Sequence, residues 1–271
     1  MRHPGRVSQT YRPRAQRRRR SRTSTVIVWL LVVAVLAWAS MTDLGRRPFD
    51  PRHLSLPFGR EIVLGADSQT LLAAGPRTPL TQAIGELGVR ESSGAGPYRR
   101  DRFGQAWADE DHNGCDTRND ILARDLQDVR FKRGTHDCVV RQGTFIDPYT
   151  GRQLDFRRGA GTSSAVQIDH VVALADAWES GAWAWSAAKR QRFANDPLNL
   201  LAVDGPANED KGAASADQWM PPNTGFACGY IARQVAVKRQ WGLSVTEPER
   251  QAMARTAASC PSQQLPTREG R

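Results

Sequence analysis

The sequence has few cysteines and no Cys-x-x-Cys pair; its four cysteines are Cys115, Cys138, Cys228 and Cys260. Structural zinc sites commonly use such closely spaced pairs, so these spacings argue against a zinc centre. An even number of cysteines indicates disulfide bonds in an oxidising compartment instead. Three pairings are possible. We favour Cys115–Cys138 with Cys228–Cys260, because each bond joins cysteines that are near in the sequence.

Acidic residues and lysine are absent from residues 1–24, which contain nine arginines. The whole chain has 38 basic and 28 acidic residues and a formal net charge of +10, so the part beyond residue 24 is close to neutral. This excludes a protein that binds nucleic acid through a uniformly basic folded surface. Any phosphate-binding surface must be a local patch.

Charged residues are also absent between Thr23 and Thr42, and the run from Val26 to Ala39 is wholly apolar. A basic flank before an apolar segment is typical of an export signal whose basic side stays in the cytoplasm. Residues 25–42 are near the lower length limit for a transmembrane anchor, and they equally suit a signal peptide cleaved near Ala39. Both alternatives place the rest of the chain outside the cytoplasm. A nucleic-acid-binding role for the arginine-rich tail is a third interpretation.

Composition divides the chain into five parts. We expect a cytoplasmic tail at 1–24, the anchor or signal segment at 25–42, a Pro- and Gly-rich linker at 43–97, a folded domain at 98–260 and a disordered tail at 261–271. Within the linker, only Leu71–Ala74 and Ala83–Val89 favour short helices.

The folded domain mixes strand and helix patterns and is predicted to be α+β. Strands are expected between Phe131 and Phe156, around turns at Gly134 and Asp147-Pro148. Helices are expected after Asp116, between Leu174 and Phe193, between Phe226 and Trp241, and after Thr246, where Glu249 completes a capping box. Arg233, Lys238 and Arg239 offer either a local basic patch or a solvated helix face.

A possible calcium loop precedes the first of these helices. Positions 1, 3, 5 and 12 of such a loop are occupied by Asp109, Asp111, Asn113 and Asp120, with Gly114 at position 6. Position 12 is Asp, where Glu usually gives bidentate ligation, and only a short helix can precede the loop. The alternative is a polar turn that leads into a helix capped by Asp116.

One stretch, residues 166–211, collects the side chains that phosphodiester hydrolysis needs. A strand ends at Asp169-His170, a second strand follows Asn199, and Pro206 begins a helix that carries Asn208 and Lys211. A carboxylate and an amide oxygen suit a hard cation, and an imidazole can take a proton from water. Because consecutive strand residues point to opposite faces, Asp169 and His170 can share one centre only where the strand ends and twists.

These residues resemble the HNH motif of ββα-metal nucleases, with Asn208 as the third member of the motif. Beyond the motif, residues 98–260 resemble exported bacterial HNH endonuclease family proteins of the DUF1524 type. The matching phrases, in order, are Gly114-Cys115-Asp116-Thr117-Arg118-Asn119-Asp120, Asp147-Pro148-Tyr149-Thr150-Gly151, Gln167-Ile168-Asp169-His170-Val171-Val172-Ala173-Leu174 and Asn195-Asp196-Pro197-Leu198-Asn199-Leu200.

The resemblance implies an HNH core with added helices that cleaves nucleic acid, DNA or RNA. It implies that His170 is the general base, and that Asp169 and Asn208 converge with it and ligate one divalent cation, Mg²⁺ or Mn²⁺. It further implies that Asn199 braces the loop and orients His170, and that Lys211 contacts phosphate. Two other functions are compatible with the sequence: a catalytically silent exported binding module with this fold, and a phosphodiesterase for small substrates.

Overall fold

The computed structural model describes residues 53–55, 61–63 and 66–267, which belong to two compact units divided between Leu64 and Gly65. In the first unit, β1 (His53–Ser55) and β2 (Glu61–Val63) pair as antiparallel strands. The predicted arginine-rich tail and the anchor or signal segment at 25–42 lie outside the described residues. Within the described residues, the helices are too short or too polar to cross a membrane.

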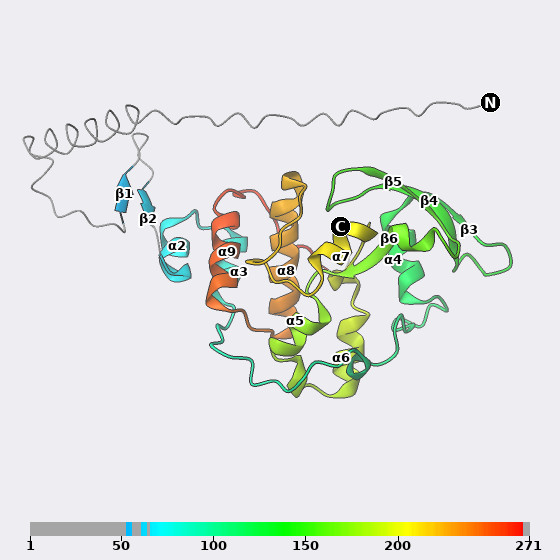
Figure 1. The fold of residues 1–271 in the computed structure, drawn as a ribbon, viewed down its shortest axis with the longest axis horizontal. Coiled ribbons are helices and arrows are strands. Elements are labelled where there is room, and N and C mark those ends of the chain that lie inside the picture. Colours follow the sequence, from blue (N-terminus) through cyan, green and yellow to red (C-terminus); the bar gives the residue numbers. More distant parts are fainter. Residues whose placement is uncertain (1–52, 56–60, 64–65, 268–271) are drawn as a thin grey trace, which may run out of the picture. The chain divides into compact units, whose positions relative to one another are not determined.

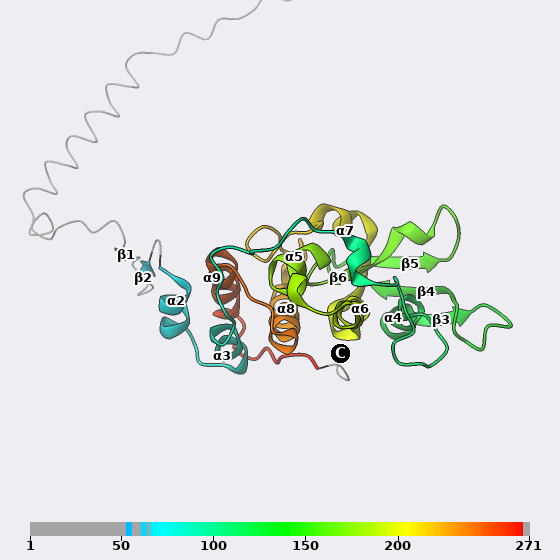
Figure 2. The ribbon, with the colours of Figure 1, turned by 90° about the horizontal axis from the view of Figure 1, so that it is seen from below.

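The second unit begins with helices in the region predicted as linker, which corrects the predicted boundary at residue 98. They are α2 (Ser68–Ala74) and α3 (Pro79–Gly85), and α3 packs on α8 (Ala227–Trp241) and α9 (Glu247–Ala257), as Figures 1 and 2 show. Thr78 and Thr81 form a capping box, and Leu80 and Ile84 enter the core fully buried. The apolar 3–4 spacing of this segment therefore prevails over its proline-rich composition.

Contacts at the start and at the end of the second unit show that residues predicted as linker and tail pack on the fold. Ser68 bonds the Glu247 carboxylate through its amide and its hydroxyl at 2.6 and 2.9 Å, which ties α2 to α9. The predicted disordered tail is corrected in the same way, because Leu265 packs against the core. Residues 268–271 lie outside the described part.

The hairpin β6 (Val166–His170) and β7 (Leu200–Asp204) lies at the centre of the second unit, followed directly by α7 (Gly205–Lys211). The strands pair antiparallel, with Val166 opposite Asp204 and His170 opposite Leu200. Alternation gives the hairpin two apolar faces. Val166, Ile168, Leu200 and Ala202 pack with residues of α4 (Thr117–Asp125), whereas Leu201 and Val203 join the α3–α8–α9 core.

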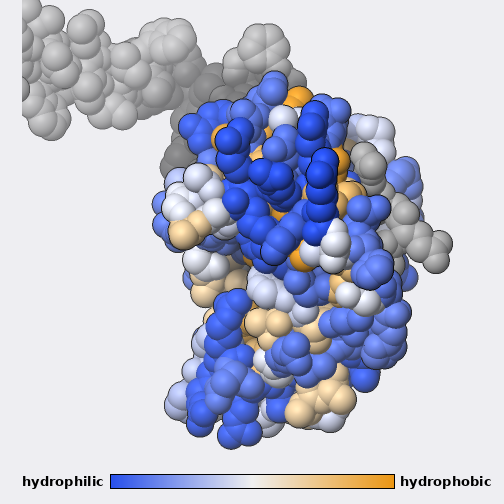
Figure 3. All heavy atoms as spheres, turned by 90° about the vertical axis from the view of Figure 1, so that its right-hand side faces the viewer, coloured by the Kyte–Doolittle hydropathy of each residue, from blue (hydrophilic) through white to orange (hydrophobic). Residues whose placement is uncertain are grey.

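A second antiparallel sheet covers α4. It comprises β3 (Gln127–Phe131), β4 (Val140–Ile146) and β5 (Gln153–Arg157), in that order, and its inner face buries Phe145 and Phe156. Figure 3 views this end of the unit, where hydrophilic residues cover most of the surface. The sheet therefore has one packed and one solvated face, as is usual for antiparallel sheets.

The segment between the hairpin strands is helical, as predicted. It contains α5 (Leu174–Glu179), α6 (Ala187–Ala194) and the 3₁₀ turns Ala182–Ala184 and Pro197–Asn199. Trp178 and Trp185 pack against its apolar core, whereas Trp183 is 44% exposed. Further 3₁₀ turns occur at Arg100–Phe103, Ser163–Ala165 and Thr224–Phe226.

Both predicted disulfides are confirmed. Cys115 is bonded to Cys138, and Cys228 to Cys260, closing loops of 23 and 32 residues. Cross-links that close loops of this length lower the entropy of the unfolded chain and stabilise the fold by about 3–4 kcal/mol each in the chain-entropy model.

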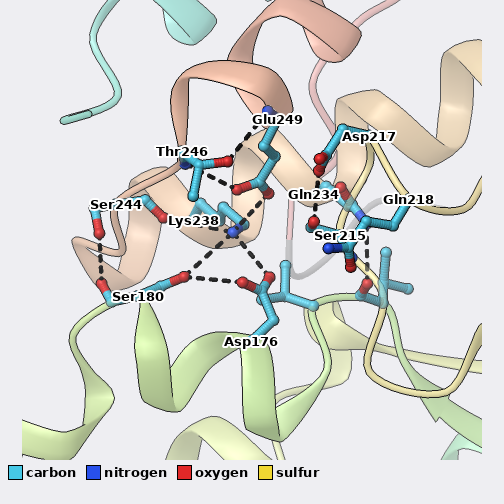
Figure 4. A network of polar contacts seen from close by, with 12 residues as sticks. Asp176, Ser180, Ser215, Asp217, Gln218, Gln234, Lys238, Ser244, Thr246 and Glu249 are labelled. Atoms are coloured by element: carbon cyan, nitrogen blue, oxygen red, sulfur yellow. Dashed lines mark hydrogen bonds and ion pairs between the residues drawn. The ribbon is translucent and has the colours of Figure 1, made fainter. Parts of the chain in front are cut away.

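A buried ionic cluster joins α5, α8 and α9 (Figure 4). The fully buried ammonium of Lys238 lies 2.9 Å from Asp176 and 2.7 Å from Glu249. Burial by itself lowers the pKa of Lys238, but the two carboxylates outweigh it and raise that pKa, which keeps the side chain charged. Lys238 is therefore a structural residue, which corrects its place in the predicted basic patch. Arg239 pairs with Glu86, and Arg233 bonds the Leu198 carbonyl.

We expect Lys238→Met to lower the free energy of unfolding by about 3–5 kcal/mol, because Glu249 then lies buried without a cation. Arg239→Ala, which removes an ion pair that is more than half exposed, is the matched control and should cost less than about 1 kcal/mol. Urea unfolding of both variants measures the difference. A Lys238→Met protein as stable as the control variant would contradict the role given to this cluster.

Candidate active site

The end of β6 directs Asp169 and His170 to opposite sides of the strand. Asp169 faces α7 and Tyr149, whereas His170 faces Trp107 and the end of α6 at Ala194. The expected convergence of the two side chains on one centre is therefore not present. The strand keeps its regular alternation through His170, because His170 is still paired with Leu200.

Asp169 lies in a buried polar interface between β6 and α7. Its carboxylate accepts hydrogen bonds from the Tyr149 hydroxyl at 2.5 Å and from Lys211 Nζ at 3.0 Å. Burial raises the pKa of Asp169, and the Lys211 ammonium and the Tyr149 hydroxyl oppose that rise. One turn earlier on α7, Asn208 Nδ2 donates to Gln167 Oε1 at 2.7 Å. The interface between β6 and α7 thus contains two successive side-chain contacts, Asn208 with Gln167 and Lys211 with Asp169.

Lys211 serves this interface and not the surface. Its side chain is 1% exposed, and Nζ also donates to the His170 carbonyl oxygen at 2.9 Å. A phosphate cannot reach the ammonium in this arrangement. The predicted phosphate contact would require α7 to move away from β6, with loss of a buried ion pair.

His170 lies in a different environment, buried but next to a cavity. Its Nε2 is 2.8 Å from the Ala194 carbonyl oxygen, and its ring lies nearly parallel to the Trp107 indole, with 6.2 Å between ring centroids. A carbonyl oxygen only accepts, so Nε2 carries the proton and Nδ1 of the neutral ring keeps a free lone pair. Within the described residues, Nδ1 makes no hydrogen bond. Burial lowers the pKa of His170 to about 4, so the ring is neutral near pH 7.

Asn199 holds the backbone that follows His170. Its side-chain oxygen accepts from the Val172 amide at 2.8 Å, and its side-chain nitrogen donates to the Val172 carbonyl at 3.1 Å. Its own carbonyl accepts from the Val171 amide. Asn199 is fully buried and contacts the loop and not the imidazole, so this placement agrees with the bracing part of its predicted role.

The predicted cation ligands fit a divalent ion in chemistry but not in placement. Both carry the oxygen donors that Mg²⁺ and Mn²⁺ prefer. However, each carboxylate oxygen of Asp169 already accepts a hydrogen bond, one of them from the competing positive charge of Lys211. Among the described residues, no group of three or more His, Cys, Asp and Glu side chains is placed to hold a metal ion. A cation at Asp169 would have to displace Lys211 or Tyr149.

The predicted calcium loop forms a compact acidic turn before α4. Asn113 Nδ2 donates to Asp111 Oδ2 and Asp120 Oδ1 at 3.1 and 3.2 Å, and the Gly114 amide donates to Asp109. Burial and the neighbouring carboxylates raise the pKa of Asp120, which Asn113 opposes. The amide of Asn113 thus occupies the space between the carboxylates, and calcium binding stays a prediction.

Sequence reasoning missed three residues of this region as functional candidates. Gln167 and Tyr149 lie in phrases that carry the family resemblance, and that signal marked their importance without a role. Trp107 belongs to a loop with a left-handed backbone (φ 58°), and only the tertiary structure brings it to His170.

Comparison with known proteins identifies the family of the chain. Residues 116–256, just over half of the chain, match the model of the family described as GmrSD restriction endonucleases, C-terminal domain. The chain is also 35% identical over 176 residues to an uncharacterized secreted protein of Arthroderma benhamiae, which covers 64% of this chain and 81% of that protein. No solved structure matches.

The matched region runs from the cap of α4 to the last helix and includes the hairpin, the helical segment between its strands and α7. It therefore contains His170, Asp169, Asn199, Asn208 and Lys211 together. The chain belongs to the family of the GmrSD restriction endonuclease C-terminal domain.

Proposed function

We propose that the chain is an endonuclease that hydrolyses phosphodiester bonds of nucleic acid outside the cytoplasm, with His170 as the general base. Membership of a restriction endonuclease family supports a nuclease-type hydrolase with a nucleic acid substrate. Two disulfide bonds suit an oxidising compartment, and the related Arthroderma benhamiae protein is named as secreted.

The observation that carries this proposal is the state of His170. A general base must be neutral, oriented and able to reach a water molecule. Burial keeps the ring neutral near pH 7 and also makes it a weaker base than an exposed histidine. The Ala194 carbonyl sets the tautomer, and Trp107 and the Asn199-braced loop limit the movement of the ring. Nδ1 is then the atom that takes the proton as the water attacks phosphorus.

One divalent cation, Mg²⁺ or Mn²⁺, belongs to the proposal on the strength of the family resemblance. When bound, such an ion would supply charge neutralisation for the attacked phosphate and for the leaving oxygen. Asn208 and Asp169 are its proposed protein ligands. Asp169 can bind the ion only after its hydrogen bond with Lys211 or Tyr149 is broken. The effect of EDTA on cleavage tests whether the ion is required.

We expect the full-length protein to nick plasmid DNA or degrade RNA, and His170→Ala to lower that rate by about 10²–10⁴-fold, the usual contribution of a general base. His136→Ala, which changes an exposed loop histidine, is the control and should leave the rate unchanged. Gel assays with Mg²⁺, Mn²⁺, Ca²⁺ or EDTA measure both the rate and the metal requirement.

Two outcomes of these assays would contradict the proposal. Binding without cleavage by the wild-type protein under all four conditions would favour a silent binding module. Cleavage that survives in His170→Ala would show that another group accepts the proton.

The neutral state of His170 also predicts a pH dependence of stability. The pKa of His170 is about 4 in the folded protein, against about 6.5 in an unfolded chain, so below pH 6.5 the unfolded state binds more protons. Stability from this residue is therefore complete above pH 6.5 and is lost as the pH falls towards 4, by about 3 kcal/mol. Urea unfolding at pH 7, 5.5 and 4.5 should show a steeper loss for wild type than for His170→Gln. Parallel losses would mean that the imidazole is not buried in its neutral form.

A further inference from the structure

A cavity of about 260 Å³ lies beside His170, on the side of β6 away from Asp169. Resting on the nuclease function proposed above, we propose that this cavity binds an unstacked nucleobase, so that single-stranded nucleic acid is the preferred substrate class. Its walls come from the 3₁₀ turn Arg100–Phe103, the loop 104–107, His170, Leu174 of α5 and Ala194 of α6.

The size of the cavity limits what it can hold. Pockets for drug-sized ligands measure about 300–1,000 Å³, so a cavity slightly below that range suits one aromatic ring system and not a segment of duplex. Its lining is mainly apolar, with Phe103, Leu174 and the Trp107 indole among the contributors. Such walls cannot satisfy a phosphate, but they suit the flat faces of a base.

The loop 104–107, which lines the cavity, contains one residue in an unfavourable backbone conformation. Trp107 has φ 58°, which is uncommon for a large side chain, and Gly104 has φ 76°. A Cβ at Gly104 would lie 2.5 Å from Gln191 Oε1, so the loop approaches α6 more closely than another residue would permit. Strained backbone persists where surrounding contacts enforce it, and such positions cluster at ligand sites. The strained residue is Trp107, and its indole stacks against the imidazole of His170.

Arg100 gives the cavity a positive group, and the Asp101 carboxylate, which also lines the cavity, is paired with Arg99. Its side chain is exposed and lines the cavity, and besides its contact with Tyr98 it acts on His170 through its charge. Arginine is the common partner of backbone phosphates in nucleic-acid complexes. With the base in the apolar part, Arg100 is positioned for the phosphate attached to that nucleotide, next to the group that activates water.

Entry of a nucleobase into the cavity favours single-stranded over double-stranded nucleic acid. In a duplex, a base must be unpaired and unstacked before it can enter, which costs free energy that a single strand largely avoids. The nearly neutral charge of the folded part provides little general attraction for a duplex to offset that cost. Single strands, loops and frayed ends are therefore the expected substrates.

Binding tests this inference without depending on hydrolysis. The full-length protein, in EDTA, is titrated into a fluorescein-labelled single-stranded 12-mer of thymidine and into a labelled 12-base-pair duplex, with anisotropy as the readout. We expect the single strand to bind at least about tenfold more tightly, since stacking and duplex opening both favour it. Equal affinities, or tighter duplex binding, would overturn the inference.

Two variants locate the binding in the cavity. Ala106→Phe introduces a large side chain at an exposed lining position, and Arg100→Ala removes the phosphate partner; both should weaken single-strand binding by about tenfold. Arg102→Ala, an exposed arginine next to this set that does not line the cavity, is the charge-matched control and should bind within about twofold of wild type. Wild-type affinity in Ala106→Phe would overturn the placement. Circular dichroism confirms that each variant is folded.

The two proposals fail differently. Plasmid or RNA cleavage together with unaltered binding by the cavity variants would leave the nuclease function standing and remove the nucleobase pocket. Loss of binding in the cavity variants, with no cleavage under any metal condition, would keep the pocket and remove the nuclease function.

Discussion

A buried ion pair between Lys211 and Asp169 fixes the relation of α7 to the central hairpin. An ammonium group in an apolar interior is several kcal/mol less stable than in water unless a negative partner and further acceptors surround it. Lys211 finds the Asp169 carboxylate at 3.0 Å and the His170 carbonyl oxygen at 2.9 Å. These two partners are consecutive residues of β6. The Lys211 ammonium therefore fixes the position of the last turn of α7 relative to the strand, and it also holds the backbone of His170.

The imidazole itself is positioned from the other side of the strand. The Ala194 carbonyl sets its tautomer, Trp107 lies along its face, and Asn199 holds the loop that follows it. Each of these groups comes from a different segment, so the orientation of His170 depends on the complete fold of the second unit. Under the proposed function, the imidazole is thus pre-organised to accept a proton, which lowers the reorganisation needed at the moment of reaction.

Local signals in the sequence predicted much of this fold, and long-range contacts account for what was missed. Gly242 and the Thr246–Glu249 capping box marked helix ends that the structure confirms. The equivalent box at Thr78–Thr81 was hidden by proline-rich composition, although Leu80 and Ile84 had the spacing of a buried helix face. The side to which His170 points was not predictable, because Ala194 and Trp107 are distant in the sequence. The same holds for Lys211, whose partner lies on a strand before the helical segment.

Asp169 and His170 lie on opposite sides of β6, and the two sides differ in how open they are to a ligand. The side of β6 that holds Asp169 is closed by a neutralising lysine, whereas the side that holds His170 opens to a cavity lined by Arg100 and apolar groups. The proposed substrate recognition is therefore assigned to the histidine side, where a nucleotide would approach without breaking a buried contact. Since most of the net positive charge lies in residues 1–24, recognition by the folded part has to come from such local contacts and not from a general electrostatic field. A recognition site of this kind selects the shape and accessibility of one nucleotide more than the charge of a long backbone.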